Sequence, residues 1–224
     1  DSNPEIAAAK ALSVPLMHRS EFLARHVSDM RTIAVTGTSG KSTVVAMIFE
    51  ILEAAGRGPS VITGGALIAL QKKGLTGNAF RGKSDILVVE ADESDGSLVN
   101  YKPAVGVFLN LTKDHLEVSA LREIFLKFRG NVATALVNSD DPALADIRSD
   151  VSFGLSSGSV HAEDLTLSAA VSQFRVKDTA FQLPVPGRHN AENALAAIAA
   201  CLNEGVSLDD CSRALATFQG VARR

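Results

Sequence analysis

The sequence is poor in cysteine. Its 224 residues include only two, Cys201 and Cys211, and both fall on the apolar faces of expected helices. Two cysteines exclude the dense disulfide framework of a small secreted domain. We expect two buried thiols rather than a disulfide, which suits a reducing cytosol.

The sequence also has no surplus of positive charge and no long hydrophobic run. It has 22 Lys and Arg against 25 Asp and Glu, a net charge of -3, so it lacks the surplus that neutralises a nucleic-acid backbone, and we expect no nucleic-acid partner. No uninterrupted apolar run approaches membrane-spanning length, and residues 1–5 lack the basic start of a signal peptide. We therefore expect a cytoplasmic protein with no membrane partner.

The chain does have ample apolar material. With 46% hydrophobic and 21% charged residues, it can form one large domain, or one domain plus an appendage. We expect the appendage at residues 1–29, where Asn3 caps a helix that ends near Leu12 and a second helix runs from Ser20 to Val27. The missing initiator methionine suggests that a longer protein contains this chain.

The stretch 36–43, TGTSGKST, has the pattern of a phosphate-binding loop. It follows the apolar run 32–35, expected to be a buried strand, and precedes apolar residues at helical spacing. Its two glycines would let backbone N–H groups turn toward a polyphosphate, Lys41 would reach the outer phosphates, and the Ser42 hydroxyl suits Mg²⁺. Val35 stands where the usual pattern places its first glycine. The alternative interpretation is a glycine-rich turn that merely opens a helix.

Beyond the loop, β-rich runs alternate with helical patterns. This alternation predicts an α/β fold, like that of P-loop NTPases, with a mostly parallel sheet and helices on both faces. The expected strands are residues 32–35, 60–63, 85–89, 105–111 and 134–138. Between residues 151 and 184 the helical period disappears, and short runs at 160–167, 174–176 and 180–183 predict a small antiparallel section. Helices are expected again at 191–202 and from Ser207 to Phe218.

Polar residues follow the ends of these strands, at the sheet edge where α/β folds bind ligands. Glu90 comes directly after the strand 85–89, in the place where NTPases keep an acidic metal or water ligand. The acidic residues behind it fit a functional role and a solvated loop equally well: Asp92, Glu93 and Asp95. His115 follows the strand 105–111 and is a second candidate ligand.

A later helix begins with polar side chains. His189 and Asn190 stand at its start, where capping is the alternative role, above all for Asn190. Asn193, one turn on, could present its amide to a purine edge.

Six stretches in order resemble the motifs of the central ATPase domain of the Mur ligase family. They are residues 36–43 (TGTSGKST), 90–95 (EADESD), 110–115 (NLTKDH), 138–142 (NSDDP), 186–195 (PGRHNAENAL) and 218–224 (FQGVARR). The late first glycine of the loop belongs to that pattern. Residues 61–65 and 90–95 resemble the alanine-adding branch most, and the branch that recycles a murein tripeptide second.

The resemblance implies an ATP-dependent, ADP-forming amide-bond ligase of peptidoglycan precursor synthesis. Its small-molecule substrates would be ATP, UDP-N-acetylmuramate and an amino acid or peptide. Residues 1–29 would be the end of an N-terminal UDP-sugar domain and residues 30–224 the ATP-binding middle domain, covalently continuous with a C-terminal domain for the amino acid. This chain alone would then be nearly inactive, because both acceptor sites lie elsewhere.

Carried over residue by residue, the resemblance also implies a site. Lys41, Glu90 and His115 would act in catalysis, and Ser42, Glu90 and His115 would hold Mg²⁺. ATP would contact the loop and two later segments: Gly37, Thr38, Ser39, Gly40, Lys41, Ser42, Thr43, His189, Asn190, Asn193 and Arg224. Ser39 stands where relatives often have His or Asn. Lys127 is the nearest candidate for the carbamylated lysine of many members, but we expect it on a solvated helix face.

Two other classes of protein remain open. One is a P-loop phosphotransferase or switch, although residues 138–141 do not form a guanine-reading motif. The other is a nucleotide-binding module that no longer catalyses, although Lys41, Glu90 and His115 are all intact.

Overall fold

The computed structural model describes residues 3–94, 96–112 and 118–222, and its body is built on one large sheet. Eight described strands lie in the order β4-β2-β5-β1-β6-β7-β8-β9, parallel except for the edge pair β4–β2. They are β1 (Arg31–Thr36), β2 (Ser60–Ile62), β4 (Ala79–Phe80), β5 (Ile86–Glu90), β6 (Val105–Phe108), β7 (Thr134–Asn138), β8 (Val151–Gly154) and β9 (Val160–His161). The predicted mostly parallel α/β fold is confirmed.

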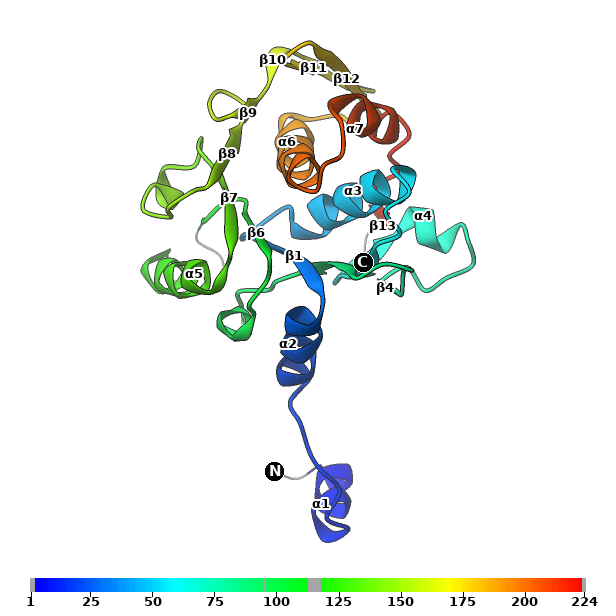
Figure 1. Cartoon of the computed structure of the whole chain (residues 1–224), viewed down its shortest axis with the longest axis vertical. Coiled ribbons are helices and arrows are strands. Elements are labelled where there is room, and N and C mark those ends of the chain that lie inside the picture. The colour runs from blue at the N-terminus through cyan, green and yellow to red at the C-terminus, as the bar shows by residue number, and fades with distance from the viewer. Residues whose placement is uncertain (1–2, 95, 113–117, 223–224) are drawn as a thin grey trace.

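Helices cover both faces of this sheet (Figure 1). One face carries α3 (Lys41–Ala54), α6 (Arg188–Asn203) and α7 (Leu208–Leu215), and the other carries α2 (Arg19–Asp29) and α5 (Val118–Asn131). In β1, Ile33 and Val35 belong to the first core and Ala34 to the second. A strand buried on both sides is apolar throughout, which is why it reads as a continuous run in the sequence.

An aromatic cluster anchors α5 to the sheet. The Phe108 ring lies 5.9 Å from the Phe125 ring and 5.5 Å from the Phe128 ring, centroid to centroid, and all three side chains are fully buried. The helical spacing of the last two predicted this face. Lys127 lies on the exposed side of the same helix, as expected.

Two small antiparallel sheets are added to the body. β10 (Glu163–Leu167), β11 (Ser172–Val176) and β12 (Thr179–Leu183) form one, and β3 (Ala66–Leu67) pairs with β13 (Val221–Ala222) in the other. The single expected strand 160–167 was wrong: β9 joins the main sheet, and the chain then turns away into β10. β8 was not predicted, because a short apolar run does not reveal which sheet it joins.

The ends of several elements also differ from expectation. α2 begins at Arg19, with His18 as its N-cap, rather than at Ser20. α7 ends at Leu215 rather than Phe218, although Ser207 caps its start as predicted. β6 ends three residues early because the chain after Phe108 turns aside to hydrogen-bond with the glycine loop. Three short helical segments complete the fold: α4 (Ile68–Gln71), η1 (Ser97–Asn100) and η2 (Pro142–Leu144).

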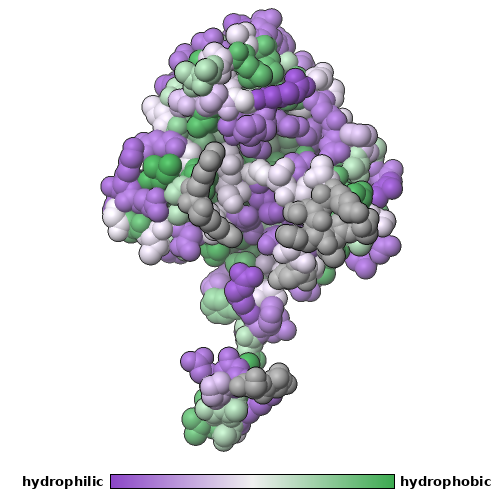
Figure 2. All heavy atoms as spheres, turned by 180° about the vertical axis from the view of Figure 1, so that it is seen from behind, coloured by the Kyte–Doolittle hydropathy of each residue, from purple (hydrophilic) through white to green (hydrophobic). Residues whose placement is uncertain are grey.

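The N-terminal helix α1 (Pro4–Ala11) lies away from the body, at the lower end of Figure 1. Asn3 caps it as predicted, accepting from the Glu5 and Ile6 amides, but none of its residues is buried. Hydrophobic surface is visible on this segment in Figure 2. Five of the eight exposed large hydrophobic side chains in the described chain fall here or at the start of α2: Leu12, Val14, Leu16, Met17 and Phe22.

Two further expectations concern the thiols and the membrane. Cys201 and Cys211 are both free and buried, as predicted, and burial raises the pKa of the Cys201 thiol. Among the helices of the described chain, none combines the length and apolar character that a membrane crossing requires.

Candidate nucleotide site

The predicted loop joins the end of β1 to the start of α3 at the carboxyl edge of the sheet. β1 lies between β5 and β6, so the segments after all three strands meet beside this loop. A cavity of about 240 Å³ opens there, lined by residues 38–43 and Glu90. Gly40 occupies the N-cap of α3 and no side chain caps this helix. Its first N–H groups and the positive end of its dipole are therefore suited to an anion.

Both glycines of the loop are required by its geometry. Gly37 has φ +147°, and a Cβ there would lie 2.8 Å from the Leu109 Cβ. Gly40 has φ +86°, and a Cβ there would lie 2.5 Å from Oδ1 of Asn193. Any larger residue would be strained and would push the loop away from the elements that support it.

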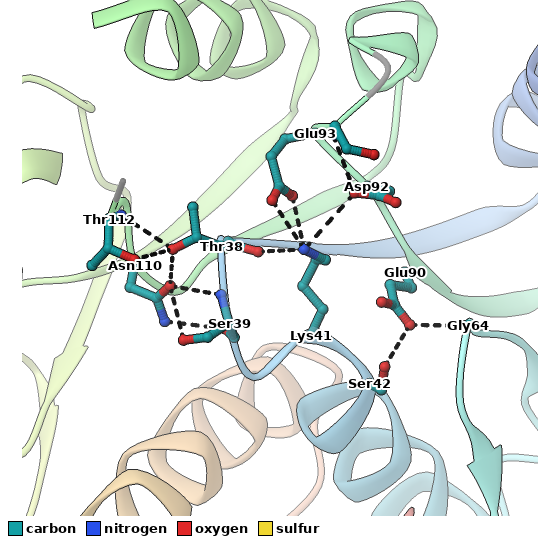
Figure 3. Close-up of polar contacts among 12 residues, drawn as sticks. Thr38, Ser39, Lys41, Ser42, Gly64, Glu90, Asp92, Glu93, Asn110 and Thr112 are labelled. Carbon is teal, nitrogen blue, oxygen red and sulfur yellow. Dashed lines mark hydrogen bonds and ion pairs between the residues drawn. The ribbon is translucent and has the colours of Figure 1, made fainter. Parts of the chain in front are cut away.

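Lys41 is held by an ion pair that the sequence did not predict. Its Nζ donates to the Gly37 carbonyl oxygen at 2.7 Å and to both oxygens of Glu93, at 2.9 and 3.1 Å (Figure 3). The two side chains are 12% and 6% exposed, whereas Asp92, 3.9 Å from Nζ, is 58% exposed. Burial raises the pKa of Glu93, opposed by the hydrogen bond and charge of Lys41. Glu93, for which a solvated loop was an equal alternative, is thus part of the site.

Glu90 connects the residues on the other side of the cavity through hydrogen bonds. Its Oε2 accepts three hydrogen bonds of 2.8 Å, from Ser42 Oγ, Thr63 Oγ1 and the Gly64 amide. Glu90 is the last residue of β5 rather than the first beyond it. The Ser42 hydroxyl and the Glu90 carboxylate are hard oxygen donors side by side on the cavity wall, which is the ligand chemistry that Mg²⁺ prefers. These residues therefore fit the expected ion.

The loop is fastened to the segment after β6. Asn110 Oδ1 accepts from Thr38 Oγ1 at 2.8 Å and from the Ser39 amide at 2.9 Å, and its Nδ2 donates to the Ser39 carbonyl at 3.1 Å. Thr112 lies 2.8 Å from Thr38, hydroxyl to hydroxyl. The sequence analysis placed Asn110 and Thr112 in the family-like stretch 110–115 but gave neither of them a role. Their place at the end of a strand beside the loop was the signal that could have indicated this supporting role.

Of the three polar residues at the start of α6, the structure brings Asn193 to the loop. Its side chain is 8% exposed and packs directly behind Gly40. Asn190 does not cap the helix: Gly187 is the N-cap, no side chain caps it, and Asn190 Nδ2 instead donates to the Pro186 carbonyl at 2.8 Å. His189 is exposed beside Gly187.

A second buried asparagine belongs to the family-like stretch 138–142, but its role was not predicted. Asn138, at the end of β7, is 2% exposed and donates through Nδ2 to the Leu109 carbonyl at 2.9 Å and to Glu192 Oε1 at 2.7 Å. It thereby ties β7 to α6 and to the segment that supports the loop.

Some predicted residues lie outside the described part of the chain, namely Asp95, His115 and Arg224. Within the described residues, no group of three or more His, Cys, Asp or Glu side chains is placed to hold a metal. A larger cavity of about 550 Å³ lies between α2 and the edge strands β2 and β4, lined by His26, Met30 and Arg81 among others. It contains none of the predicted site residues, so we assign the site by its chemistry rather than by volume.

The fold and the loop define a P-loop nucleotide-binding domain. Comparison with protein families narrows this class, because residues 35–201 match the model described as the Mur ligase middle domain. The chain belongs to the Mur ligase family.

Individual relatives agree with this membership. A UDP-N-acetylmuramate–L-alanine ligase of Burkholderia multivorans is 36% identical over 241 residues, covering 99% of this chain and 51% of the relative. Among solved structures, a UDP-N-acetylmuramate–alanine ligase of Thermotoga maritima superposes with a TM-score of 0.87 at 32% identity, covering 100% of this chain and 54% of that one. A UDP-N-acetylmuramate:L-alanyl-γ-D-glutamyl-meso-diaminopimelate ligase of Neisseria meningitides gives 0.82 at 25% identity, covering 97% and 75%. This chain spans about half the length of the curated relatives it matches.

Proposed function

We propose that the protein containing this chain is an ATP-dependent, ADP-forming ligase that joins L-alanine to UDP-N-acetylmuramate in the cytoplasm, and that this chain supplies its ATP site. The observation that carries the proposal is the cavity at the start of α3, where Lys41 and the Ser42–Glu90 pair flank N–H groups that no side chain caps. The 36% identity to an alanine-adding ligase along the whole chain supports the choice of substrates.

In this proposal the reaction has two steps. The substrate carboxylate attacks the γ-phosphorus of ATP, giving an acyl phosphate and ADP; the amine then attacks the acyl carbon and phosphate leaves. Phosphoryl transfer depends mainly on positioning and on neutralising charge. Lys41 would bind the β- and γ-phosphates, and the α3 N-terminus would bind phosphate oxygens. Mg²⁺, held by Ser42, Glu90 and His115, would neutralise phosphate charge.

The remaining predicted contacts concern the nucleotide base. Asn193 is the best supported, because it lies against the loop and comes from the same helix as His189 and Asn190. Arg224 is proposed to approach the nucleotide on the strength of the family resemblance alone.

Three further loop residues, Thr38, Ser39 and Thr43, would contact the phosphates rather than the base.

We also propose the domain division that the resemblance implies. Residues 1–29 would belong to a UDP-sugar domain, and residues 30–224 would form the ATP-binding domain, continuous with a domain for the amino acid. The exposed apolar side chains of residues 12–22 support this, because such a cluster usually marks a covered surface. The length of the relatives agrees.

One alternative substrate has its own support. The Neisseria meningitides tripeptide ligase has nearly the same fold, with a TM-score of 0.82. A recycling ligase that adds a tripeptide is therefore the second candidate.

The test is an assay of the complete protein for ADP release. UDP-N-acetylmuramate with L-alanine should give turnover, and UDP-N-acetylmuramate with L-alanyl-γ-D-glutamyl-meso-diaminopimelate should give little. Turnover with the tripeptide alone would select the second candidate, and turnover with neither would reject the ligase proposal.

A further inference from the structure

Lys41, the residue that the proposed function assigns to the outer phosphates, already has hydrogen-bond acceptors within the chain. The Gly37 carbonyl and the two oxygens of Glu93 all lie within 3.1 Å of its Nζ, which has three protons to donate. A phosphate oxygen can therefore reach Lys41 only by replacing one of these acceptors.

Glu93 is the acceptor that competes most strongly. A carboxylate forms stronger, charge-assisted hydrogen bonds to an ammonium group than a backbone carbonyl does. The pair is also shielded from water, with side chains 12% and 6% exposed, so solvent screens it little.

Glu93 would in addition repel an incoming polyphosphate. It lies beside the same ammonium group that would bind the phosphates, and like charges close together in a buried site disfavour each other. Release of Lys41 is eased because burial already raises the pKa of Glu93, and loss of the Lys41 contact removes the largest influence that lowers it. The freed carboxyl can then take up a proton rather than remain a buried charge.

We propose that Glu93 is a displaceable counter-ion, which holds Lys41 against the nucleotide-free loop and gives it up to the outer phosphates. Glu93 is then a positioning residue that weakens nucleotide binding and keeps Lys41 oriented until the nucleotide arrives. The inference rests on the proposed function, because it requires a nucleoside polyphosphate at the loop.

The neighbouring acidic residue provides a matched control. Asp92 carries the same charge one position earlier, but it is 3.9 Å from Nζ and 58% exposed, so solvent should screen its effect. Asp92→Asn therefore removes a negative charge from the same segment without removing the counter-ion.

The experiment measures binding of Mg·ATP, Mg·ADP and AMP to the 224-residue chain and three variants by calorimetry, with competition titrations for weak ligands. Glu93→Gln should bind Mg·ATP and Mg·ADP roughly tenfold more tightly than the wild type, because the ion pair no longer has to break. AMP, which lacks outer phosphates, should bind the two equally. Asp92→Asn should stay within about twofold of the wild type.

Two further measurements separate this role from a purely structural one. Glu93→Asp keeps the charge on a shorter side chain and should show a smaller gain than Glu93→Gln. Without nucleotide, Glu93→Gln should melt below the wild type, and saturating Mg·ATP should shrink that difference, since both proteins then have Lys41 on phosphate.

The outcomes are distinct. If Glu93→Gln and Glu93→Asp bind Mg·ATP no more tightly than the wild type, the counter-ion proposal is wrong while the nucleotide site stands. A gain of equal size for AMP would also overturn it. If neither the wild type nor Asp92→Asn binds Mg·ATP, the nucleotide site itself is wrong.

Discussion

The carboxyl edge of the sheet and the N-terminal segment 3–18 differ in how far their side chains are buried and bonded to the rest of the chain. At the sheet edge, Lys41, Glu90 and Asn110 each make two or more hydrogen bonds to segments distant in sequence. In the segment 3–18, α1 has no buried residue and the apolar side chains beyond it face solvent. The comparison teaches that the described residues of the candidate nucleotide site are held by contacts within the body, whereas the segment 3–18 contributes no buried residue to it.

The largest expected effect comes from shortening one apolar side chain in each of the two regions to alanine. Phe108→Ala should lower the free energy of unfolding of the chain by about 3–5 kcal/mol, because it empties a fully buried position against α5. Leu16→Ala, at a 52% exposed position, should change it by less than about 0.5 kcal/mol. Urea unfolding measures both. Equal losses of unfolding free energy in the two variants would contradict this comparison, because Leu16 would then be packed as closely as Phe108.

The next largest expected effect is on the pH dependence of stability, and it comes from a buried carboxyl group. Glu50 on α3 lines a pocket of about 330 Å³ beside α7, and its Oε1 is buried with no hydrogen-bond partner among the described residues. Burial raises its pKa to about 7. The folded state thus holds a proton that the unfolded chain releases near pH 4.5, so stability should fall as pH rises from there to about 7.

Replacing this carboxyl should remove that loss. Glu50→Gln should stabilise the chain at pH 8 by about 2 kcal/mol, less than the full shift implies because the site is partly open to solvent, and by little at pH 5. Glu123→Gln is the control, since Glu123 is exposed on α5, which covers the opposite face of the sheet. Thermal unfolding at the two pH values distinguishes them. A gain for Glu50→Gln that does not depend on pH would contradict this account.

Two glycines of positive φ give a smaller effect. Gly40→Ala and Gly56→Ala introduce similar backbone strain, at φ +86° and +71°, but only the first brings a Cβ against another side chain, that of Asn193. Gly40→Ala should therefore cost about 1 kcal/mol more than Gly56→Ala. It should also weaken Mg·ATP binding, which the control should not. Equal unfolding midpoints for the two variants would show that Asn193 does not support the loop.

The smallest expected effect is on removal of the N-terminal segment. A chain beginning at Met17, which keeps the His18 cap of α2, should unfold within about 0.5 kcal/mol of the 224-residue chain, because α1 buries nothing against the body. In the complete protein, by contrast, Leu16→Ala should cost more than in this chain if residues 12–22 pack against another domain. Calorimetry of both proteins measures this. No difference between them would remove the support that these side chains give to the proposed division.

Local patterns in the sequence predicted the parts of the site that lie next to each other along the chain. The strand, the glycine loop and the helix of residues 31–54 follow from apolar spacing and glycine position, and Glu90 follows from its place after an apolar run. Lys41 and Glu93 are 52 positions apart, and Thr38 and Asn110 are 72 apart. Such pairings depend on which strands are neighbours in the sheet, and one sequence does not reveal that order.

The central claim is that the loop 36–43 binds the phosphates of a nucleotide. The most direct test is to measure Mg·ATP binding to the wild-type chain and to Lys41→Ala by calorimetry. The variant loses the ammonium group that flanks the cavity and leaves Glu93 without its counter-ion, so it should unfold at a lower temperature than the wild type. It should keep the fold, because Lys41 belongs to neither hydrophobic core. We predict measurable binding to the wild type, a loss of roughly 100-fold or more in Lys41→Ala, and similar circular dichroism spectra. Equal affinity of the two proteins for Mg·ATP would contradict the account.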